Sequence, residues 1–231
     1  MQVTLIASTK VDHQAIDTAV GGFWKNDQNT TDADHLAETG GRLCYWSFSR
    51  PSEKTAANED YLRNIIRQQH FSVLEHASAT FLIQGVSRSL THELIRHRHL
   101  SYSQLSQRFV NEEGAEFVVP PAIESVREET SPPGFMEDLM AAHAKNAANA
   151  YGTIVDALTK KGFARKQARE AARAVLPNMT ETKIVVTGNH RAWREVIKRR
   201  DDPAADAEIQ LLARELLKQL KEIAPNTYQD L

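Results

Sequence analysis

Residues 87–108 of the chain read SRSLTHELIRHRHLSYSQLSQR. This stretch holds four arginines and three histidines against a single carboxylate, that of Glu93. Ser87 can cap a helix that runs to about His97, and it follows an apolar strand closed by Gly85. Because solvated helix faces usually mix both signs of charge, a one-sided run of cations with serines and glutamines between them indicates an anionic ligand. We expect that ligand to carry a phosphate or a polyphosphate.

Outward from this stretch, short strands and helices alternate in no repeating order. The apolar patterns predict strands at residues 3–7, 79–84 and 183–187. They predict helices at residues 32–45, 54–70, 136–161, 164–176 and 192–200, and a final helix that restarts at Asp201 or Asp202 with Pro203. Residues 110–134 are predicted to be an irregular loop or insertion around a short strand at 116–119. Together these elements predict a single α+β domain over residues 1–231, with a small, mostly antiparallel or mixed sheet packed with long helices.

The composition is that of an ordinary soluble globular chain. It has 231 residues, of which 41% are apolar and 25% charged, and its formal net charge is -2. This charge argues against a dedicated nucleic-acid binder, whose domain is usually basic overall. No run approaches the ~18 apolar residues of a membrane span, and the N-terminus lacks the long apolar stretch of a signal peptide. The single cysteine, Cys44, fits a reducing compartment, so we expect a cytoplasmic protein that does not bind membranes.

Two motifs suggest well-known chemistries that the residues do not support. The string HELIRH is similar to a zinc-protease motif, but His92 and His97 are five residues apart and Arg96 would repel the metal, so we expect no metal site. Neither residue directly beside Cys44 in RLCYW is basic, and we expect Cys44 to be a small buried hydrophobe rather than a nucleophile. Neither GxGxxG nor GxxxxGK[ST] occurs, so a nucleotide would have to be held by side chains and helix ends.

Two further cationic clusters lie far from the first in sequence. Arg165, Arg169 and Arg173 recur every four residues and therefore share one helical face. The other cluster, GNHRAWREVIKRR at residues 188–200, begins at a strand end and finishes on basic residues, some of which could equally be solvated helix caps. Because arginine meets phosphate bidentately, three such clusters favour phosphate recognition.

Several strings of the chain resemble those of the flavin-dependent thymidylate synthases. Arg96-His97-Arg98, followed after seven residues by Ser106, is similar to the RHRx7S signature of that family. The strings QHFSVLEHA at 69–77, ARAVLP at 172–177 and TGNHRAW at 187–193 are similar to further family strings, in the same order. The resemblance covers roughly residues 3–228 and is greatest to actinobacterial members.

This resemblance implies reductive methylation of dUMP to dTMP. The family takes the carbon from methylenetetrahydrofolate and the electrons from NADPH through FAD, so Cys44 is expected to be catalytically idle. By similarity, FAD is contacted by Ser72, Arg96, His97, Arg98, Gln104, Asn189, His190, Arg191 and Glu195. The dUMP site is expected to comprise Glu93, Arg96, Gln104, Leu105, Ser106, Gln107, Arg108, Arg173 and Arg200.

The resemblance also implies a role for Arg200, which aligns with an arginine that favours ionisation at N3 of the uracil. Because a guanidinium keeps its proton, we expect this catalytic role to be electrostatic. Glu195 stands where the family often has Asn, His or Gln, and Ala204 stands where many members have His. Family members form homotetramers whose active sites are shared between subunits, an arrangement that would also relieve the repulsion among three cationic clusters in one small domain.

Two other classes of protein remain open from the residues alone. A nucleic-acid-binding module would use residues 87–97 as a recognition helix, but the net charge and the near absence of aromatics beside the basic residues count against it. A plain interaction protein would use the same helices only for packing. The colour of the purified protein separates these classes from a flavin enzyme.

Overall fold

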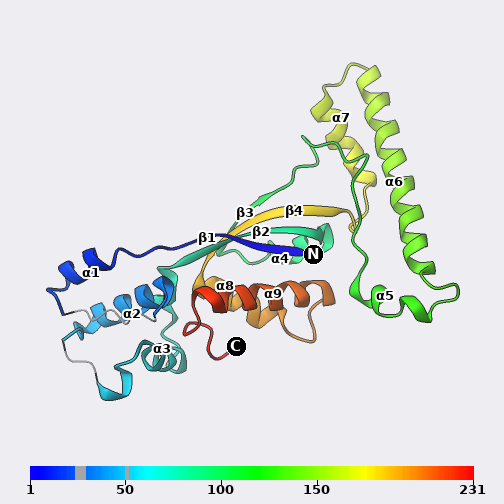
Figure 1. The fold of residues 1–231 in the computed structure, drawn as a ribbon. Helices are drawn as coiled ribbons and strands as arrows, with labels where there is room; N and C mark the ends of the chain where they lie inside the picture. The colour runs from blue at the N-terminus through cyan, green and yellow to red at the C-terminus, as the bar shows by residue number, and fades with distance from the viewer. Residues whose placement is uncertain (24–29, 50–51) are drawn as a thin grey trace.

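An antiparallel sheet of four strands forms the centre of the fold (Figure 1). The computed structural model describes residues 1–23, 30–49 and 52–231. Within them the strand order is β1-β2-β4-β3, and the strands are β1 (Gln2–Ser8), β2 (Ser78–Ser87), β3 (Leu100–Gln104) and β4 (Glu181–Asn189). Every neighbouring pair is antiparallel. The predicted α+β class with a mostly antiparallel sheet is therefore confirmed.

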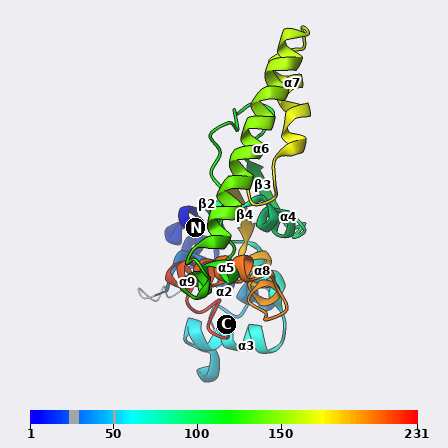
Figure 2. The same cartoon turned by 90° about the vertical axis from the view of Figure 1, so that its right-hand side faces the viewer.

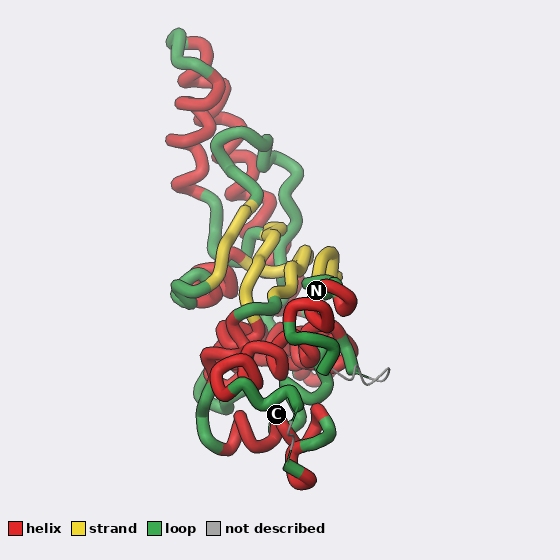
Figure 3. The backbone as a smooth tube through the Cα atoms, turned by 90° about the vertical axis from the view of Figure 1, so that its left-hand side faces the viewer, coloured by secondary structure: helices red, strands yellow, loops and turns green. Residues whose placement is uncertain are grey.

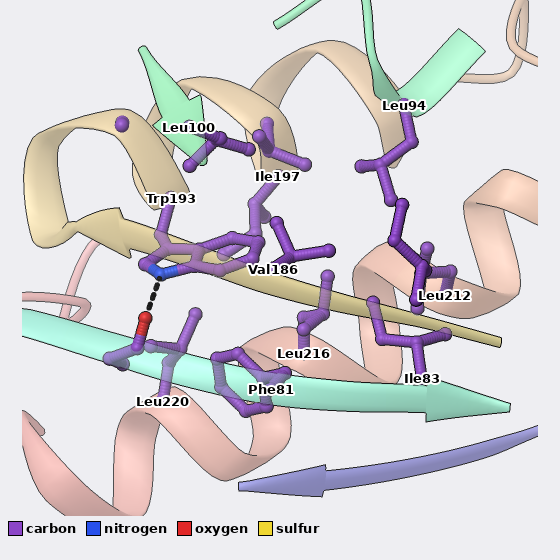
Figure 4. Close-up of a cluster of buried hydrophobic side chains, with 14 of the residues drawn as sticks. Phe81, Ile83, Leu94, Leu100, Val186, Trp193, Ile197, Leu212, Leu216 and Leu220 are labelled. Carbon is purple, nitrogen blue, oxygen red and sulfur yellow. Dashed lines mark hydrogen bonds between the residues drawn. The ribbon is translucent and has the colours of Figure 1, made fainter. Parts of the chain in front are cut away.

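One face of the sheet carries the main hydrophobic core. Along β2, Ala79, Phe81 and Ile83 are buried and alternate with half-buried residues, as expected for a strand with one covered face. Two helices cover that face, α8 (His190–Arg200) and α9 (Ala207–Ile223). Figure 4 shows the contact, in which the Trp193 ring packs edge-on to Phe81 and its Nε1 donates to the Ala79 carbonyl oxygen at 3.1 Å. The core therefore fixes α8 against the sheet.

The short strand β3 is held close to β4 by a glycine. Leu100 pairs with Gly188, and a Cβ at position 188 would collide with the Leu100 side chain. At the other end of β3, Gln104 pairs with Ile184. The sequence did not predict this strand, because Ser101 and Ser103 face outward and only Leu100 is fully buried.

The remaining helices fall into two groups by their position in the chain. Near the N-terminus are α1 (His13–Ala19), α2 (Asp32–Tyr45) and α3 (Asn58–Arg67), and the second group comprises α4 (Arg88–Leu94), α5 (Pro121–Ser125), α6 (Phe135–Lys160) and α7 (Arg165–Ala172). Single 3-10 turns occur at η1 (Glu53–Thr55), η2 (Phe71–Glu75), η3 (Arg127–Glu129) and η4 (Arg173–Val175). Figures 1, 2 and 3 show that α6 and α7 form a hairpin that projects from the body on the side of the sheet away from α8 and α9.

Several predicted boundaries were wrong, each for a local reason. The helix predicted at 54–70 is split, since η1 precedes α3 and α3 begins only at Asn58. The strand predicted at 116–119 is reduced to one bridge, Phe117 to Thr180. The final helix has Asp206 as its N-cap residue, so it begins after the predicted restart at 201–203. The sequence did not predict α1.

The C-terminal segment closes over the N-terminal helices through buried polar contacts. Asp34 on α2 accepts the backbone N–H groups of Asn226 and Thr227, each at 2.9 Å, and the Thr227 hydroxyl at 2.6 Å. Burial raises the pKa of the Asp34 carboxyl, against the opposing effect of these hydrogen bonds. Arg194 on α8 donates to both carboxylate oxygens of Asp230 at 2.7 Å. These contacts tie the C-terminal segment to α2 and to α8.

Candidate active site

A cationic pocket of about 640 Å³ opens between η2, the residues after α4, and α8. Its volume falls within the range of about 300–1,000 Å³ found for small-molecule and cofactor sites. Six lysine and arginine side chains line it against two carboxylates, Glu75 and Glu195. This excess of positive charge in a concave site suits an anionic ligand.

Helix α8 forms one wall of the pocket because of its periodicity. Asn189 ends β4 and caps the helix, with its Oδ1 accepting from the Ala192 N–H at 2.8 Å. Arg191, Glu195 and Lys198 follow at spacings of three and four residues and line the pocket. The opposite face of the helix carries Trp193 into the core. The packing that buries this tryptophan therefore turns the polar face of α8 toward the pocket.

The facing wall is the turn Arg96-His97-Arg98, which links α4 to β3. The hydroxyl of Tyr102, a residue of β3, lies 2.7 Å from the Leu94 carbonyl oxygen and 2.8 Å from that of His97. These contacts hold the turn against the strand. In the described part of the chain, neither Arg96 nor Arg98 forms an ion pair. The arginines on α8 differ, because Arg191 pairs with Glu75 and Arg199 with Glu195. Within the described residues, no ion pair therefore compensates the charges of Arg96 and Arg98.

Arg200 joins this turn to the preceding helix. Its Nη1 donates to the Glu93 carboxylate at 2.6 Å, its Nη2 to the Glu93 carbonyl oxygen at 3.0 Å, and its Nε to Nε2 of His97 at 3.0 Å. Burial, with Arg200 and then Arg199 nearby, lowers the pKa of His97 to about 4. His97 is therefore neutral at pH 7, and its Nε2 can accept the hydrogen bond from Arg200.

A second group of predicted residues lies at the other end of β3. The chain leaves the strand at Leu105, whose N–H donates to the Lys183 carbonyl oxygen at 2.9 Å and whose carbonyl accepts from Arg88 at 3.0 Å. The turn that follows contains Ser106 and Gln107, then Arg108, whose side chain is 43% exposed and 3.8 Å from Glu170. Arg173, also exposed, begins η4 at the base of the projecting hairpin.

Buried polar atoms around this turn lack partners. Among the described residues, Nε of Arg88, Nε2 of Gln107, Oε1 of Glu112 and Nε of Arg169 are buried without a hydrogen bond. Burial lowers the pKa of Arg88 and raises that of Glu112. Because unsatisfied buried polar groups cost about 1–3 kcal/mol each, this turn has unused capacity to bind polar groups. We define residues 105–112, with Arg88, Arg169 and Arg173, as the loop end of the site, and the cationic pocket as its pocket end.

The structure brings together some of the predicted residues and separates others. Arg96, His97, Arg98, Asn189, Arg191 and Glu195 of the predicted FAD set all line the pocket. Ser72 is exposed on η2 beside Phe71, which lines the pocket. The Gln104 amide instead donates to Thr91 and Thr182, at 3.1 and 3.3 Å. His190 is buried with its Nδ1 2.9 Å from the Tyr228 hydroxyl, so its side chain faces the interior.

Sequence reasoning missed part of the pocket lining, notably Arg194 and Glu75. Helical spacing from Arg191 could have indicated Arg194, but not that Asp230 would neutralise it. Cys44, predicted to be buried, is exposed, and its Sγ lies 3.4 Å from the Gly40 carbonyl oxygen. No group of three or more metal-ligating side chains occurs among the described residues, and none of their helices is long and apolar enough to cross a membrane.

Comparison with known proteins identifies the family of this chain. The family model described as "Thymidylate synthase complementing protein" matches residues 28–226. A probable flavin-dependent thymidylate synthase of Mycobacterium phage D29 is 52% identical over 231 residues, covering 100% of this chain and 96% of the relative. This chain belongs to the flavin-dependent thymidylate synthase family.

Bacterial relatives give the same result. The flavin-dependent thymidylate synthases of Mycobacteroides abscessus and Mycobacterium tuberculosis are each 52% identical, with 87% of this chain and 82% of the relative covered. These relatives confirm the resemblance to actinobacterial members and the predicted enzyme class. The roles of individual site residues remain predictions.

Proposed function

We propose that this chain converts dUMP to dTMP, taking the carbon from methylenetetrahydrofolate and the electrons from NADPH through FAD. The single observation that carries the proposal is the Arg96-His97-Arg98 turn, which faces a cationic pocket and contacts Arg200 through His97. Family membership supports thymidylate synthesis with a flavin. The identity of the flavin and of both cosubstrates belongs to the proposal.

The donor set of the pocket fits FAD. Arg96 and Arg98 offer uncompensated guanidinium groups to a pyrophosphate, and the first turn of α8 lies beside them with its positive dipole end at Asn189. Phe71 supplies an apolar surface in the same pocket, suited to a flat heterocycle. When bound, the flavin would supply the two-electron redox chemistry that the side chains lack.

The loop end fits the phosphate of dUMP. Ser106 offers a hydroxyl, and Arg108 and Arg173 offer exposed guanidinium groups suited to bidentate contacts with a phosphate, although Arg108 also lies 3.8 Å from the Glu170 carboxylate. The uracil would then lie toward Arg200 and Glu93. A fixed cation there stabilises negative charge on the N3, C4 and O4 side of the ring, which makes C5 nucleophilic without a cysteine adduct.

The two ends of the site lie at opposite ends of β3. The register of β3 places Leu100 beside Gly188 and Gln104 beside Ile184, so the strand alone separates them by about 13 Å at roughly 3.3 Å per residue. This separation supports the predicted homotetramer, in which the pocket end of one subunit would face the loop end of another. We propose such a shared site in a cytoplasmic enzyme.

The purified chain tests the proposed function directly. We expect a yellow protein that releases FAD on denaturation and forms dTMP from dUMP only when NADPH and methylenetetrahydrofolate are both supplied. A colourless protein that cannot be reconstituted with FAD, or a flavin-loaded protein that forms no dTMP, would overturn it.

Mixing variants tests the shared site. Arg96→Ala alters the pocket end and Arg108→Ala the loop end. If each site combines the two ends from different subunits, co-expression of these two chains should restore part of the activity, measured at a dUMP concentration at which each variant alone is only weakly active. The same mixture gives no recovery if every site is built within one subunit, and a monomeric active enzyme would also exclude sharing.

A further inference from the structure

A pair of carboxyl groups lies directly behind Arg200. The Asp206 carboxyl lies near enough to that of Glu93 to raise the pKa of the Glu93 carboxyl. Asp206 is the N-cap residue of α9, yet its side chain makes no capping hydrogen bond to its own helix. Two carboxylates in contact either repel each other or share a proton. Asp206 therefore interacts with Glu93 where an N-cap aspartate usually satisfies its own helix.

Charged groups from three elements surround this pair. Arg200, from the end of α8, binds the Glu93 carboxylate at 2.6 Å. Glu208, in the first turn of α9, adds a weaker repulsion, while its own oxygens accept from the N–H of Ser87 at 2.8 Å and the Ser87 hydroxyl at 2.5 Å. His97 lies on the far side of Arg200 and is neutral. Burial first, and then Asp206, raises the pKa of Glu93 despite the opposing effect of Arg200.

The proposed reaction needs an acceptor for a proton. Uracil N3 carries a proton that must leave as negative charge develops on the ring, and the Arg200 guanidinium cannot take it because it is already protonated. The Glu93 carboxylate is the base in contact with Arg200, and its affinity for a proton is increased by its surroundings. The chain thus places a base beside the cation that would stabilise the uracil anion.

We infer that Glu93, held against Arg200, accepts the N3 proton of dUMP as the catalytic residue, with the neighbouring Asp206 as a positioning residue. This inference rests on the proposed function. The N3–H bond breaks, an O–H bond forms on Glu93, and the electron pair stays on the uracil ring beside Arg200. The proton is then shared between the two carboxyl groups, which relieves their repulsion. Nothing is oxidised or reduced in this step.

The variant Asp206→Asn tests the inference with a residue that is equally favoured at a helix N-cap position. Full-length, FAD-loaded enzyme is assayed for dTMP formation across pH. We expect the acidic limb of kcat to move to lower pH, because Glu93 loses the neighbour that raises its pKa. We also expect kcat above that limb to fall about three- to tenfold, because a weaker base accepts the proton less well. The KM for dUMP and the rate of flavin reduction by NADPH should stay within about twofold of the parent.

A proton count gives an independent readout. Calorimetric titration of dUMP in two buffers of different ionisation enthalpy measures the net protons released on binding. The parent should release few, since the pair retains the N3 proton, and Asp206→Asn should release more. Asp202→Asn is the matched control, because Asp202 lies in the same connection and its Oδ1 accepts only from the Ala204 N–H, at 2.9 Å. Asp206→Ser, another N-cap residue, replaces Asp206→Asn if that variant does not fold.

The outcomes separate the inference from the function on which it rests. If the parent forms dTMP but the Asp206 variants keep its pH profile and proton count, the pair is not the proton acceptor. A large rise in the KM for dUMP at constant kcat would likewise assign Asp206 to binding alone and overturn the inference. If the parent forms no dTMP, the proposed function has failed, whatever the variants do.

Discussion

The two ends of β3 are built from similar residues, yet they differ in how completely one chain assembles them. At the pocket end, the Arg96-His97-Arg98 turn faces α8 across a pocket of about 640 Å³, and the tryptophan core of Figure 4 holds that helix in place. At the loop end, Arg108 and Arg173 are exposed, and buried polar atoms beneath the turn lack partners. One chain therefore forms a cationic pocket at the pocket end, whereas the described residues of the loop end include exposed cations and buried polar atoms without partners.

This difference separates structural arginines from those available to ligands. Arg194 and Arg42 are buried and paired, the first with Asp230 and the Thr227 carbonyl, the second with Glu38 at 2.6 Å and the Thr55 carbonyl at 2.8 Å. Arg96 and Arg98 form no ion pair within the described residues. Since uncompensated cations repel one another, anions bound at either end should stabilise the folded protein.

The largest effect is expected at Arg200, which connects the pocket to Glu93. Arg200→Ala should lower dTMP formation by about 10²–10³-fold, because a fixed charge that acts mainly in the transition state is lost. Arg200→Lys keeps the charge without the planar fork, so we expect an intermediate loss. Stopped-flow flavin reduction by NADPH should survive in both, as that half-reaction does not need the uracil anion. If Arg200→Ala forms dTMP at the parent rate with saturating dUMP, Arg200 only caps α8.

The next effect concerns the pocket end alone. Arg96→Ala should purify largely without flavin at moderate salt, because it removes an uncompensated cation from the proposed pyrophosphate site. Flavin content is measured from the absorbance released on denaturation. Arg214→Ala is the control, since Arg214 is exposed on α9 and pairs with Asp201 at 2.7 Å. Full flavin occupancy in Arg96→Ala would mean that the pyrophosphate is held elsewhere.

A smaller effect is expected at the loop end. Arg108→Ala should weaken dUMP binding by about 1.5–3 kcal/mol while leaving the flavin content unchanged, because a charge-assisted contact to the phosphate is lost. Calorimetric titration gives the dUMP affinity, and Arg127→Ala, on the exposed turn η3, serves as the control. Unchanged dUMP affinity would remove Arg108 from the site, and a parallel loss of flavin would contradict the division into two ends.

The sequence predicted the elements whose patterns are local and strong. Residues 136–161 were expected to be helical, and α6 spans Phe135–Lys160. The strands at 79–84 and 183–187 were located but proved longer, because pairing between them extends to residues without an apolar pattern. β3 could not be predicted, since its place depends on the close approach of Leu100 to Gly188, a contact between residues far apart in the chain.

In the site, too, the residues that are close in sequence could be predicted and the contacts between distant residues could not. Arg96, His97 and Arg98 are adjacent in sequence, so their grouping was predictable, and helical spacing added Arg191 and Glu195. The interior orientation of His190 was not predictable, because it depends on Tyr228, 38 residues away. The contact of Asp206 with Glu93 likewise required the packing of the start of α9 against α4.

The smallest effect is expected at Cys44, which belongs to neither end of β3. It lies in the last turn of α2 with an exposed thiol, and the proposed activation of uracil by Arg200 needs no covalent adduct. Cys44→Ser should therefore keep the parent rate of dTMP formation, the parent flavin content and the parent unfolding temperature, since a serine hydroxyl can also donate to the Gly40 carbonyl. The rate is measured with saturating dUMP under identical conditions. Complete loss of turnover in a folded, flavin-loaded Cys44→Ser enzyme would restore a thiol mechanism, and it would show that the chemistry is not confined to the two ends compared above.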